Sequence, residues 1–269
     1  MIRGKEWFND EHFWEQYAPI MFDESRWAEL PQAADGVTRL ARLDLYGDSG
    51  RAAAAAAAAV EDSAAPRLLD LCCGFGRATL ELAGRGFACT GVDITRAYLD
   101  AAREDAAAEK MDIEFIQADI RDFVRPGFFD LAINLYVSFG YFADPLDDKR
   151  VLANAWESLK SGGALIIETL GKEIAVRDFV RSEWFRRAGC IVLTEYAPLD
   201  SWTLLWNRWT LIKDGRRIEK EFTQRLYGAG ELRTLMLEAG FSRVEIYGGW
   251  EESPYDEKAE KLIVVGRKD

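Results

Sequence analysis

From Pro66 onward, short apolar runs alternate with stretches of helical periodicity. The apolar runs cover residues 67–72, 87–92, 112–117, 128–135, 163–169, 241–247 and 261–266. The helical stretches between them cover residues 76–85, 95–110, 144–160 and 229–239. Because buried strands that alternate with helices are typical of a mostly parallel sheet with helices on both faces, the pattern predicts a doubly wound α/β fold.

Turn-forming residues mark the ends of several predicted helices. Asp144-Pro145 is typical of a helix start. Glycines follow three helical stretches, where a left-handed C-cap favours this residue: Gly86, Gly162, Gly163 and Gly240. These residues set the expected helix boundaries.

Two parts of the chain depart from the alternation. Within 171–228, aromatic and β-branched runs at 191–196, 202–212 and 218–227 surround a hairpin-like Lys213-Asp214-Gly215-Arg216. We expect an antiparallel β insertion there, a lid over the sheet end where open α/β sheets bind ligands. Aromatics at helical spacing and an alanine tract at 52–59 predict that residues 1–60 form an N-terminal helical cap and linker. The remaining residues, 61–170 and 229–269, form the predicted core.

Composition narrows the classes of function. With 49% hydrophobic residues among 269, the chain can bury a large core, and its net charge of −12 would repel a phosphate backbone. We therefore expect no nucleic-acid partner. The four cysteines lack the spacing of a zinc site or a disulfide framework, and no apolar run is long enough to span a membrane. These features predict a cytoplasmic protein without a bound metal or a membrane partner.

A glycine turn follows the first predicted strand. Asp70 ends the strand, and Gly74 and Gly76 precede a helix, so backbone amides and a helix N-terminus face an incoming ligand. A dinucleotide site would carry a third small residue where this chain has Thr79, and the acidic Asp70 suits a cationic amino group better than a pyrophosphate. An NAD-dependent oxidoreductase is thereby disfavoured.

Two further acids follow the next strands. Asp93 ends the second strand, where a carboxylate accepts hydrogen bonds from ribose hydroxyls. Asp119 and Ile120 follow the third strand and offer an acceptor and a backbone amide to an adenine edge. Their placement at successive strand ends favours an adenosine-containing cofactor.

These motifs, together with Phe129-Asp130-Leu131-Ala132-Ile133-Asn134, resemble the class I S-adenosylmethionine-dependent methyltransferases over about residues 66–170. The resemblance implies a seven-stranded sheet whose last strand is antiparallel. Family members usually carry glycine where this chain has Cys72. The implied cofactor-binding residues are Tyr17, Asp70, Cys72, Gly74, Gly76, Asp93, Ile94, Asp119, Ile120 and Asn134.

A looser similarity, in residues 165–170, the insertion and residues 225–241, is to the small-molecule branch that includes glycine and amino-sugar N-methyltransferases. It implies a monomer or homodimer, N-terminal helices that close over the cofactor, and Tyr17 as a wall near the sulfonium. A methyl acceptor would bind at the loop after the fourth strand, where Tyr141, then Tyr136 and Ser138, offer hydroxyls as candidate catalytic groups.

Several alternatives stay open at this point. The lone histidine, His12, is more consistent with a structural role than with a proton acceptor. Arg208 could pair with a substrate carboxylate or with a surface acid. The sequence does not identify the acceptor or choose between its nitrogen, oxygen and carbon. A non-catalytic module that binds S-adenosylmethionine also remains an alternative to an enzyme.

Overall fold

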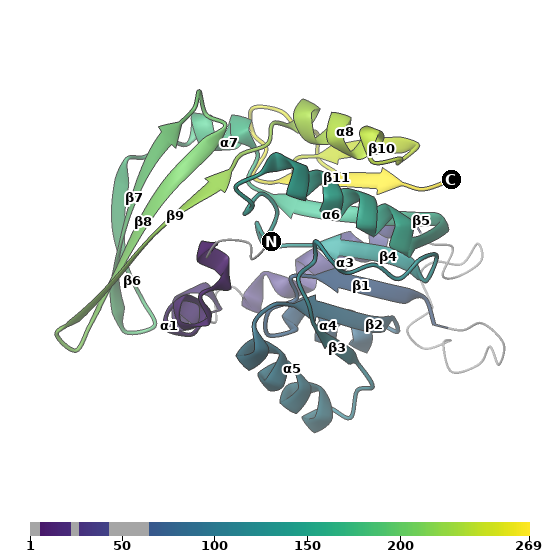
Figure 1. The fold of residues 1–269 in the computed structure, drawn as a ribbon, viewed down its shortest axis with the longest axis horizontal. Coiled ribbons are helices and arrows are strands. Elements are labelled where there is room, and N and C mark those ends of the chain that lie inside the picture. Colours follow the sequence, from purple (N-terminus) through teal and green to yellow (C-terminus); the bar gives the residue numbers. More distant parts are fainter. Residues whose placement is uncertain (1–5, 23–26, 43–64) are drawn as a thin grey trace.

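A computed structural model describes residues 6–22, 27–42 and 65–269, and these residues form two sheets (Figure 1). The larger sheet has seven strands in the order β10-β11-β5-β4-β1-β2-β3. Its strands are β1 (Arg67–Leu71), β2 (Ala88–Asp93), β3 (Glu114–Gln117), β4 (Phe129–Asn134), β5 (Leu159–Thr169), β10 (Arg243–Tyr247) and β11 (Leu262–Arg267). Six of them agree with the predicted runs to within two residues at each end, whereas β5 begins four residues before the predicted start at 163.

The strand directions confirm the predicted doubly wound sheet. β1 pairs in parallel with both β2 and β4, and the parallel pairing continues to β3 and β5. β11 is antiparallel to both β5 and β10. The last strand is therefore the reversed one, as expected.

Helices cover both faces of this sheet. Successive β1 residues point to opposite sides: Leu68 packs with α3 (Leu30–Ala41) and α4 (Arg77–Gly84), whereas Leu69 packs with α6 (Pro145–Ser158) and α8 (Ala229–Glu238). Both leucines are fully buried. α5 (Arg96–Ala108) packs against β2 and β3 near the sheet edge. The apolar runs of β1, β4 and β11 are continuous because these strands are buried on two sides.

The predicted helix boundaries are mostly confirmed. Asp144 caps α6 by accepting a hydrogen bond from the Leu146 amide at 2.9 Å, and Gly86 and Gly240 have φ values of 97° and 110° after α4 and α8. Gly162 is left-handed, with a φ of 80°, but neither Gly162 nor Gly163 caps a helix as predicted. α6 ends at Ser158 and β5 begins at once, so both glycines lie inside the strand.

The second sheet, called the lid sheet here, is antiparallel and has the order β6-β7-β8-β9. It follows α7 (Lys172–Arg177) and consists of β6 (Ser182–Arg187), β7 (Cys190–Leu199), β8 (Leu204–Lys213) and β9 (Arg216–Arg225). Asp214 and Gly215 form the predicted hairpin turn with φ values of 49° and 73°. The sequence did not predict β6, because this edge strand is mostly exposed and lacks an alternating pattern. β8 starts two residues later than predicted, since Trp202 belongs to a left-handed turn.

The N-terminal part forms η1 (Trp7–Asn9) and α1 (Glu11–Met21), and α1 lies between the lid sheet and the core (Figure 1). Phe13 of α1 shares a buried cluster with Val192 and Leu211 of the lid. The alanine tract at 52–59 falls outside the described residues. Among the helices of the described ranges, none is long and apolar enough to cross a membrane.

Candidate active site

A cavity of about 760 Å³ lies where the carboxyl ends of the parallel strands meet α1 and the lid sheet. This volume is within the range of roughly 300–1,000 Å³ that is common for small-molecule sites. Ten of the predicted site residues line it. They are Asp70, Cys72, Gly74, Asp93, Ile94, Asp119, Ile120, Tyr136, Ser138 and Tyr141.

The glycine turn forms one wall of the cavity. Cys72, Gly74 and Gly76 have φ values of 63°, 56° and 72°, so three of its five residues are left-handed. The amide of Cys73 donates to the carbonyl of Val92 at 3.1 Å, which ties the turn to β2. Gly76 caps α4 from behind the cavity lining. Cys72 therefore adopts a left-handed backbone conformation that favours glycine.

Asp70 is buried beneath the turn, with 3% of its surface exposed. The hydroxyl of Thr79 donates to its Oδ2 at 2.6 Å. Burial raises the pKa of Asp70 to about 7, against the lowering effect of the Thr79 hydrogen bond. Thr79 stands where a dinucleotide site would have a third small residue. Here its hydroxyl donates a hydrogen bond to the Asp70 carboxylate near the end of β1.

Asp93 connects the glycine turn to the start of α5. Its two carboxylate oxygens accept hydrogen bonds from the amides of Gly74 at 2.9 Å and Thr95 at 2.8 Å. The Thr95 side chain and the Ile94 amide also form hydrogen bonds with this carboxylate, and burial raises its pKa. Ile94 follows on the cavity wall. Asp93 thus presents a fixed carboxylate on the cavity wall.

Asp119 and Ile120 lie at the far end of the same wall. Ile120 is 7% exposed and belongs to the core cluster. Both oxygens of Asp119 accept hydrogen bonds from the Arg121 side chain at 2.6 to 3.0 Å. The sequence did not anticipate this arginine contact.

Aromatic side chains from the N-terminal part cover the turn. Phe22 packs edge-on against Phe75 and Tyr98 at 4.9 and 5.5 Å between ring centroids. The Tyr98 hydroxyl donates to the carbonyl of Trp14 at 2.6 Å, which joins α5 to α1. Trp14 itself lines the cavity.

Tyr17 does not line the cavity, so the structure does not bring it to the predicted position. It is fully buried, stacks on Phe13 at 4.8 Å, and donates its hydroxyl hydrogen to the carbonyl of Trp209 at 2.8 Å. Helix α1 turns Phe13 and Trp14 toward the cavity and Tyr17 toward the lid strands. Aromatic spacing alone could not tell which of these faces points inward.

Arg77 is a cavity residue that the sequence prediction missed. It is only 4% exposed, and its guanidinium carbon lies 5.0 Å from the ring centroids of both Phe22 and Tyr136. It begins α4 directly after the glycine turn. A cationic residue directly after the glycine turn could have indicated this site residue from the sequence. Its guanidinium can attract a ligand carboxylate.

The loop after β4 is strained and held from below. Tyr136 and Val137 are both left-handed, with φ values of 57° and 64°. Glu168 of β5 fixes them, because its carboxylate accepts from the Tyr136 amide at 2.6 Å and its carbonyl from the Val137 amide at 3.2 Å. Asn134 donates to the carbonyl of Leu71 at 2.9 Å and stays behind the cavity lining. Strain of this kind is common where a loop must present side chains to a ligand.

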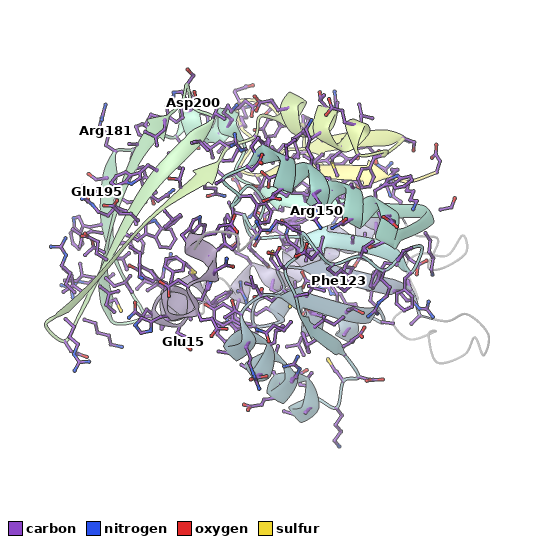
Figure 2. All side chains as sticks on the ribbon, viewed as in Figure 1. Glu15, Phe123, Arg150, Arg181, Glu195 and Asp200 are labelled. Carbon is purple, nitrogen blue, oxygen red and sulfur yellow. The ribbon has the colours of Figure 1, made fainter. Side chains whose placement is uncertain are left out.

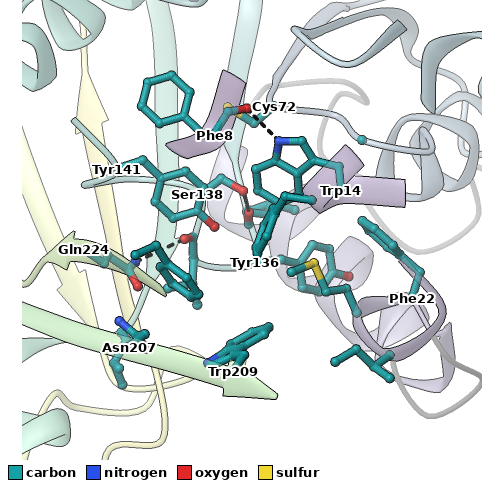
Figure 3. Close-up of a pocket in the computed structure, with 18 of the residues that line it drawn as sticks. Phe8, Trp14, Phe22, Cys72, Tyr136, Ser138, Tyr141, Asn207, Trp209 and Gln224 are labelled. Atoms are coloured by element: carbon teal, nitrogen blue, oxygen red, sulfur yellow. Dashed lines mark hydrogen bonds between the residues drawn. The ribbon is translucent and has the colours of Figure 1, made fainter. Parts of the chain in front are cut away.

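Tyr141 and Ser138 lie between Trp14 and Gln224 of the lid (Figure 3). The Tyr141 ring is 4.7 Å from Trp7 and 6.3 Å from Trp14. Burial raises the pKa of the Tyr141 hydroxyl, so this group stays protonated near neutral pH. Ser138 donates to the carbonyl of Leu135 at 3.0 Å.

The inner face of the lid completes the cavity with Asn207, Trp209 and Gln224. Arg208 points the other way and binds Glu195 through two hydrogen bonds of 2.6 Å. Glu195 lies on the side of the lid away from the core (Figure 2). Of the two roles left open for Arg208, the structure shows the pairing with a surface acid.

Cys72 leads to a prediction about stability. A left-handed L-residue costs roughly 1–2 kcal/mol, and the extra flexibility of an unfolded glycine costs about 0.5–1 kcal/mol. Cys72→Gly should therefore raise the free energy of unfolding by up to about 1 kcal/mol in urea denaturation. Cys89→Gly is the matched control, because Cys89 is a buried strand residue without a positive φ. That variant should lose stability, and an equal loss in both variants would contradict the prediction.

The cavity lining fits S-adenosylmethionine. Three carboxylates, those of Asp70, Asp93 and Asp119, face a molecule that carries an ammonium and a sulfonium. The aromatic rings of Trp14 and Tyr141 supply the faces that such cations favour. This acidic end is poorly suited to a pyrophosphate.

Seven strands in the order β3-β2-β1-β4-β5-β11-β10, with β11 reversed, form the fold of the class I S-adenosylmethionine-dependent methyltransferases. Within this class, residues 68–163 match the family described as a methyltransferase domain. The similarity favours a methyltransferase over the NAD-dependent oxidoreductase considered from the sequence.

Relatives of known name agree with this class. Glycine/sarcosine N-methyltransferase from Aphanothece halophytica is 25% identical over 222 residues, covering 78% of this chain and 79% of that enzyme. The CcbJ methyltransferase from Streptomyces caelestis shares the fold with a TM-score of 0.73 and 18% identity over 89% of each chain. CalS10, an amino pentose methyltransferase from Micromonospora echinaspora solved with bound S-adenosylmethionine, has a TM-score of 0.65 and 19% identity, covering 96% of this chain and 97% of that one.

Proposed function

We propose that the protein transfers a methyl group from S-adenosylmethionine to a nitrogen of a small molecule, with an oxygen as the alternative acceptor atom. The observation that carries the proposal is the continuity of the cavity. One lining runs from Asp70 and Asp93, past Tyr141, to Asn207 of the lid. A donor and an acceptor can therefore lie end to end without water between them.

The residues of the cofactor half have separate roles in this proposal. Asp93 accepts from the ribose hydroxyls, Asp119 and the Ile120 amide meet the adenine edge, and Asp70 attracts the ammonium. Arg77 attracts the carboxylate of the methionine part. When bound, S-adenosylmethionine supplies a methyl group on a positively charged sulfur.

The polar groups of the acceptor half favour a ligand that donates hydrogen bonds. The Asn207 amide nitrogen already donates to the carbonyl of Leu205 at 2.9 Å, and that of Gln224 to the carbonyl of Val137 at 3.3 Å. Their side-chain oxygens remain as acceptors, as does the hydroxyl oxygen of Ser138. An amine complements such a set. The names of the glycine/sarcosine and amino pentose enzymes support the same acceptor class.

Catalysis then rests on alignment. Holding two reacting groups in line can provide an effective concentration on the order of 10⁵ M. An amine that arrives neutral already has a free electron pair and therefore requires no strong base. His12 lines a neighbouring cavity and has a side chain that is 67% exposed, so it is poorly placed to remove a proton. Tyr141, whose hydroxyl stays protonated, and Ser138 orient the nucleophile.

Charge and thiol state support the rest of the proposal. The net charge of −12 argues against a nucleic-acid acceptor. The four cysteines are all free, which is consistent with a reducing cytoplasm. The acceptor is therefore proposed to be a cytoplasmic small molecule.

A labelled-methyl screen tests the function. The wild-type protein is incubated with isotopically labelled S-adenosylmethionine and pools of amines or alcohols, and the products are identified by mass spectrometry. We expect labelled N-methyl products, and a Tyr141→Phe variant should form them with a lower kcat. A wild-type protein that binds no S-adenosylmethionine in calorimetry would contradict the proposal.

A further inference from the structure

Arg121 lies directly behind the cofactor half of the cavity. Its side chain is 1% exposed and touches three carboxylates, those of Asp119, Glu6 and Asp147, at 2.6 to 2.9 Å. Its guanidinium carbon lies 5.4 Å from the Phe8 ring centroid and 4.6 Å from that of Phe142. Both the edge and the faces of the guanidinium are therefore occupied.

The three carboxylates come from distant parts of the chain. Asp119 follows β3, Asp147 lies in the first turn of α6, and Glu6 immediately precedes η1 in the N-terminal segment. Arg121 holds Glu6 through two hydrogen bonds, from Nη1 at 3.0 Å and Nη2 at 2.7 Å. The single positive charge of Arg121 therefore reduces the repulsion among three acids that lie close together.

The N-terminal segment also forms one side of a second cavity, next to the first. Residues 6–12 line it opposite Ile94, Thr95 and Gln117. Trp7 and Phe8 line both cavities. The segment therefore lies over the end of the site where Ile94 and Asp119 face the adenosine part of the cofactor in the proposed function.

Arg121 fixes the direction of the Asp119 carboxylate. Nε contacts both oxygens at 3.0 Å, and Nη2 contacts Oδ2 at 2.6 Å. The planar fork of an arginine can hold a carboxylate in one orientation, whereas a lysine ammonium cannot. Asp119 Oδ1 also accepts from the Arg121 backbone amide at 2.9 Å, and the Asp119 carboxylate so oriented lines the cavity.

We propose that Arg121 is a positioning residue that orients Asp119 for the adenine amino group and joins it, through Glu6, to the N-terminal segment. Cofactor binding and the closing of this segment are thereby coupled. The inference rests on the proposed function, because it assumes that the cavity takes S-adenosylmethionine. Arg121 itself does not line the cavity and acts through its two partners.

The orientation of Asp119 is tested by a ratio of affinities. Calorimetry compares S-adenosylhomocysteine with its inosine analogue, in which oxygen replaces the adenine amino group. We expect wild-type protein to prefer the adenine compound roughly tenfold, the effect of one hydrogen bond to a charged acceptor. In Arg121→Lys this preference should fall to about twofold or less, because the fork is lost. A purely structural role would weaken both ligands equally and leave the ratio unchanged.

Arg125→Lys is the matched control. Arg125 also binds a carboxylate, Glu114, through two nitrogens at 2.7 and 3.0 Å, but it lies outside the cavity lining. Its variant should keep the wild-type ratio. An unchanged ratio in Arg121→Lys would overturn the positioning role.

Coupling to the segment is tested with Glu6→Gln, which leaves the contact between Arg121 and Asp119 in place. Hydrogen exchange at the amides of residues 7–14 should slow on binding of S-adenosylhomocysteine in wild type. In Glu6→Gln this slowing should be largely lost. Equal slowing in both proteins would overturn the coupling, and this variant decides the inference if Arg121→Lys does not fold. A wild-type protein that binds neither nucleoside would instead overturn the proposed function, and the inference with it.

Discussion

Replacing Asp93 with alanine is expected to weaken the binding of S-adenosylmethionine about 100-fold or more. The carboxylate has two tasks in the structure and proposed function. It holds the amides of Gly74 and Thr95, and it accepts from the ribose hydroxyls. Its removal therefore takes away ligand contacts and also loosens the glycine turn. Titration calorimetry with wild type and variant measures the effect.

Asp130→Ala is a matched control for this prediction. Asp130 is also a strand carboxylate with close partners, since Lys160 Nζ contacts its two oxygens at 2.7 and 2.8 Å. It belongs to β4 but does not line the cavity. Its variant should bind the cofactor as wild type does. Equal affinities for wild type and Asp93→Ala would show that the ligand binds elsewhere.

Cofactor affinity should rise with pH as Asp70 ionises. Burial raises the pKa of this carboxyl to about 7, and the proposed partner of the ionised form is the ammonium of the methionine part. Below this pKa, the affinity should fall by up to tenfold for each pH unit, so that pH 5 and pH 8 differ by about 100-fold. Binding at pH 6 should release a proton, which calorimetry detects in buffers of different ionisation enthalpy.

Asp70→Asn isolates this group from others that titrate nearby in pH. The variant should bind weakly and with little dependence on pH between 5 and 8. Asp148, which is buried against the Tyr227 hydroxyl, also has a pKa raised to about 7 by burial, but it lies outside the cavity lining. A pH profile that is unchanged in Asp70→Asn would assign the effect to another group and contradict the prediction.

Ionisation of Asp70 should increase cofactor affinity, but it should decrease the stability of the protein without cofactor. Asp70 has a higher pKa when folded than its ordinary value of 3.8. Between about pH 4 and 7, the folded state therefore holds more protons than the unfolded state, so this group makes the free energy of unfolding fall as pH rises. Binding a cation at Asp70 offsets this loss.

The sequence predicted the parallel core well because its strands are buried on both faces, which leaves uninterrupted apolar runs. The acids at successive strand ends could be found for a related reason, since parallel strands bring their carboxyl ends to one edge. Local turn chemistry also predicted the hairpin at Asp214 and Gly215. These features depend on neighbours in the sequence or on a regular period.

Contacts between distant segments could not be predicted in this way. Glu6 and Arg121 are 115 positions apart, and neither stands in a recognisable spacing. The orientation of Tyr17 depends on how α1 packs against the lid, which no helical period specifies. Similarly, Cys72 departs from the family pattern at one position, and only the backbone shows that the turn keeps its left-handed form despite the side chain.

The separate hydrogen-bond ladder of the lid sheet has a consequence for how such enzymes diversify. The cofactor half of the site is built on the ends of the parallel strands, whereas Asn207, Trp209 and Gln224 project from β8 and β9. Exchanging these inward side chains leaves the glycine turn and Asp93 untouched. Substitutions on one face of the antiparallel lid sheet can thus change the methyl acceptor while the binding site for the methyl donor stays the same.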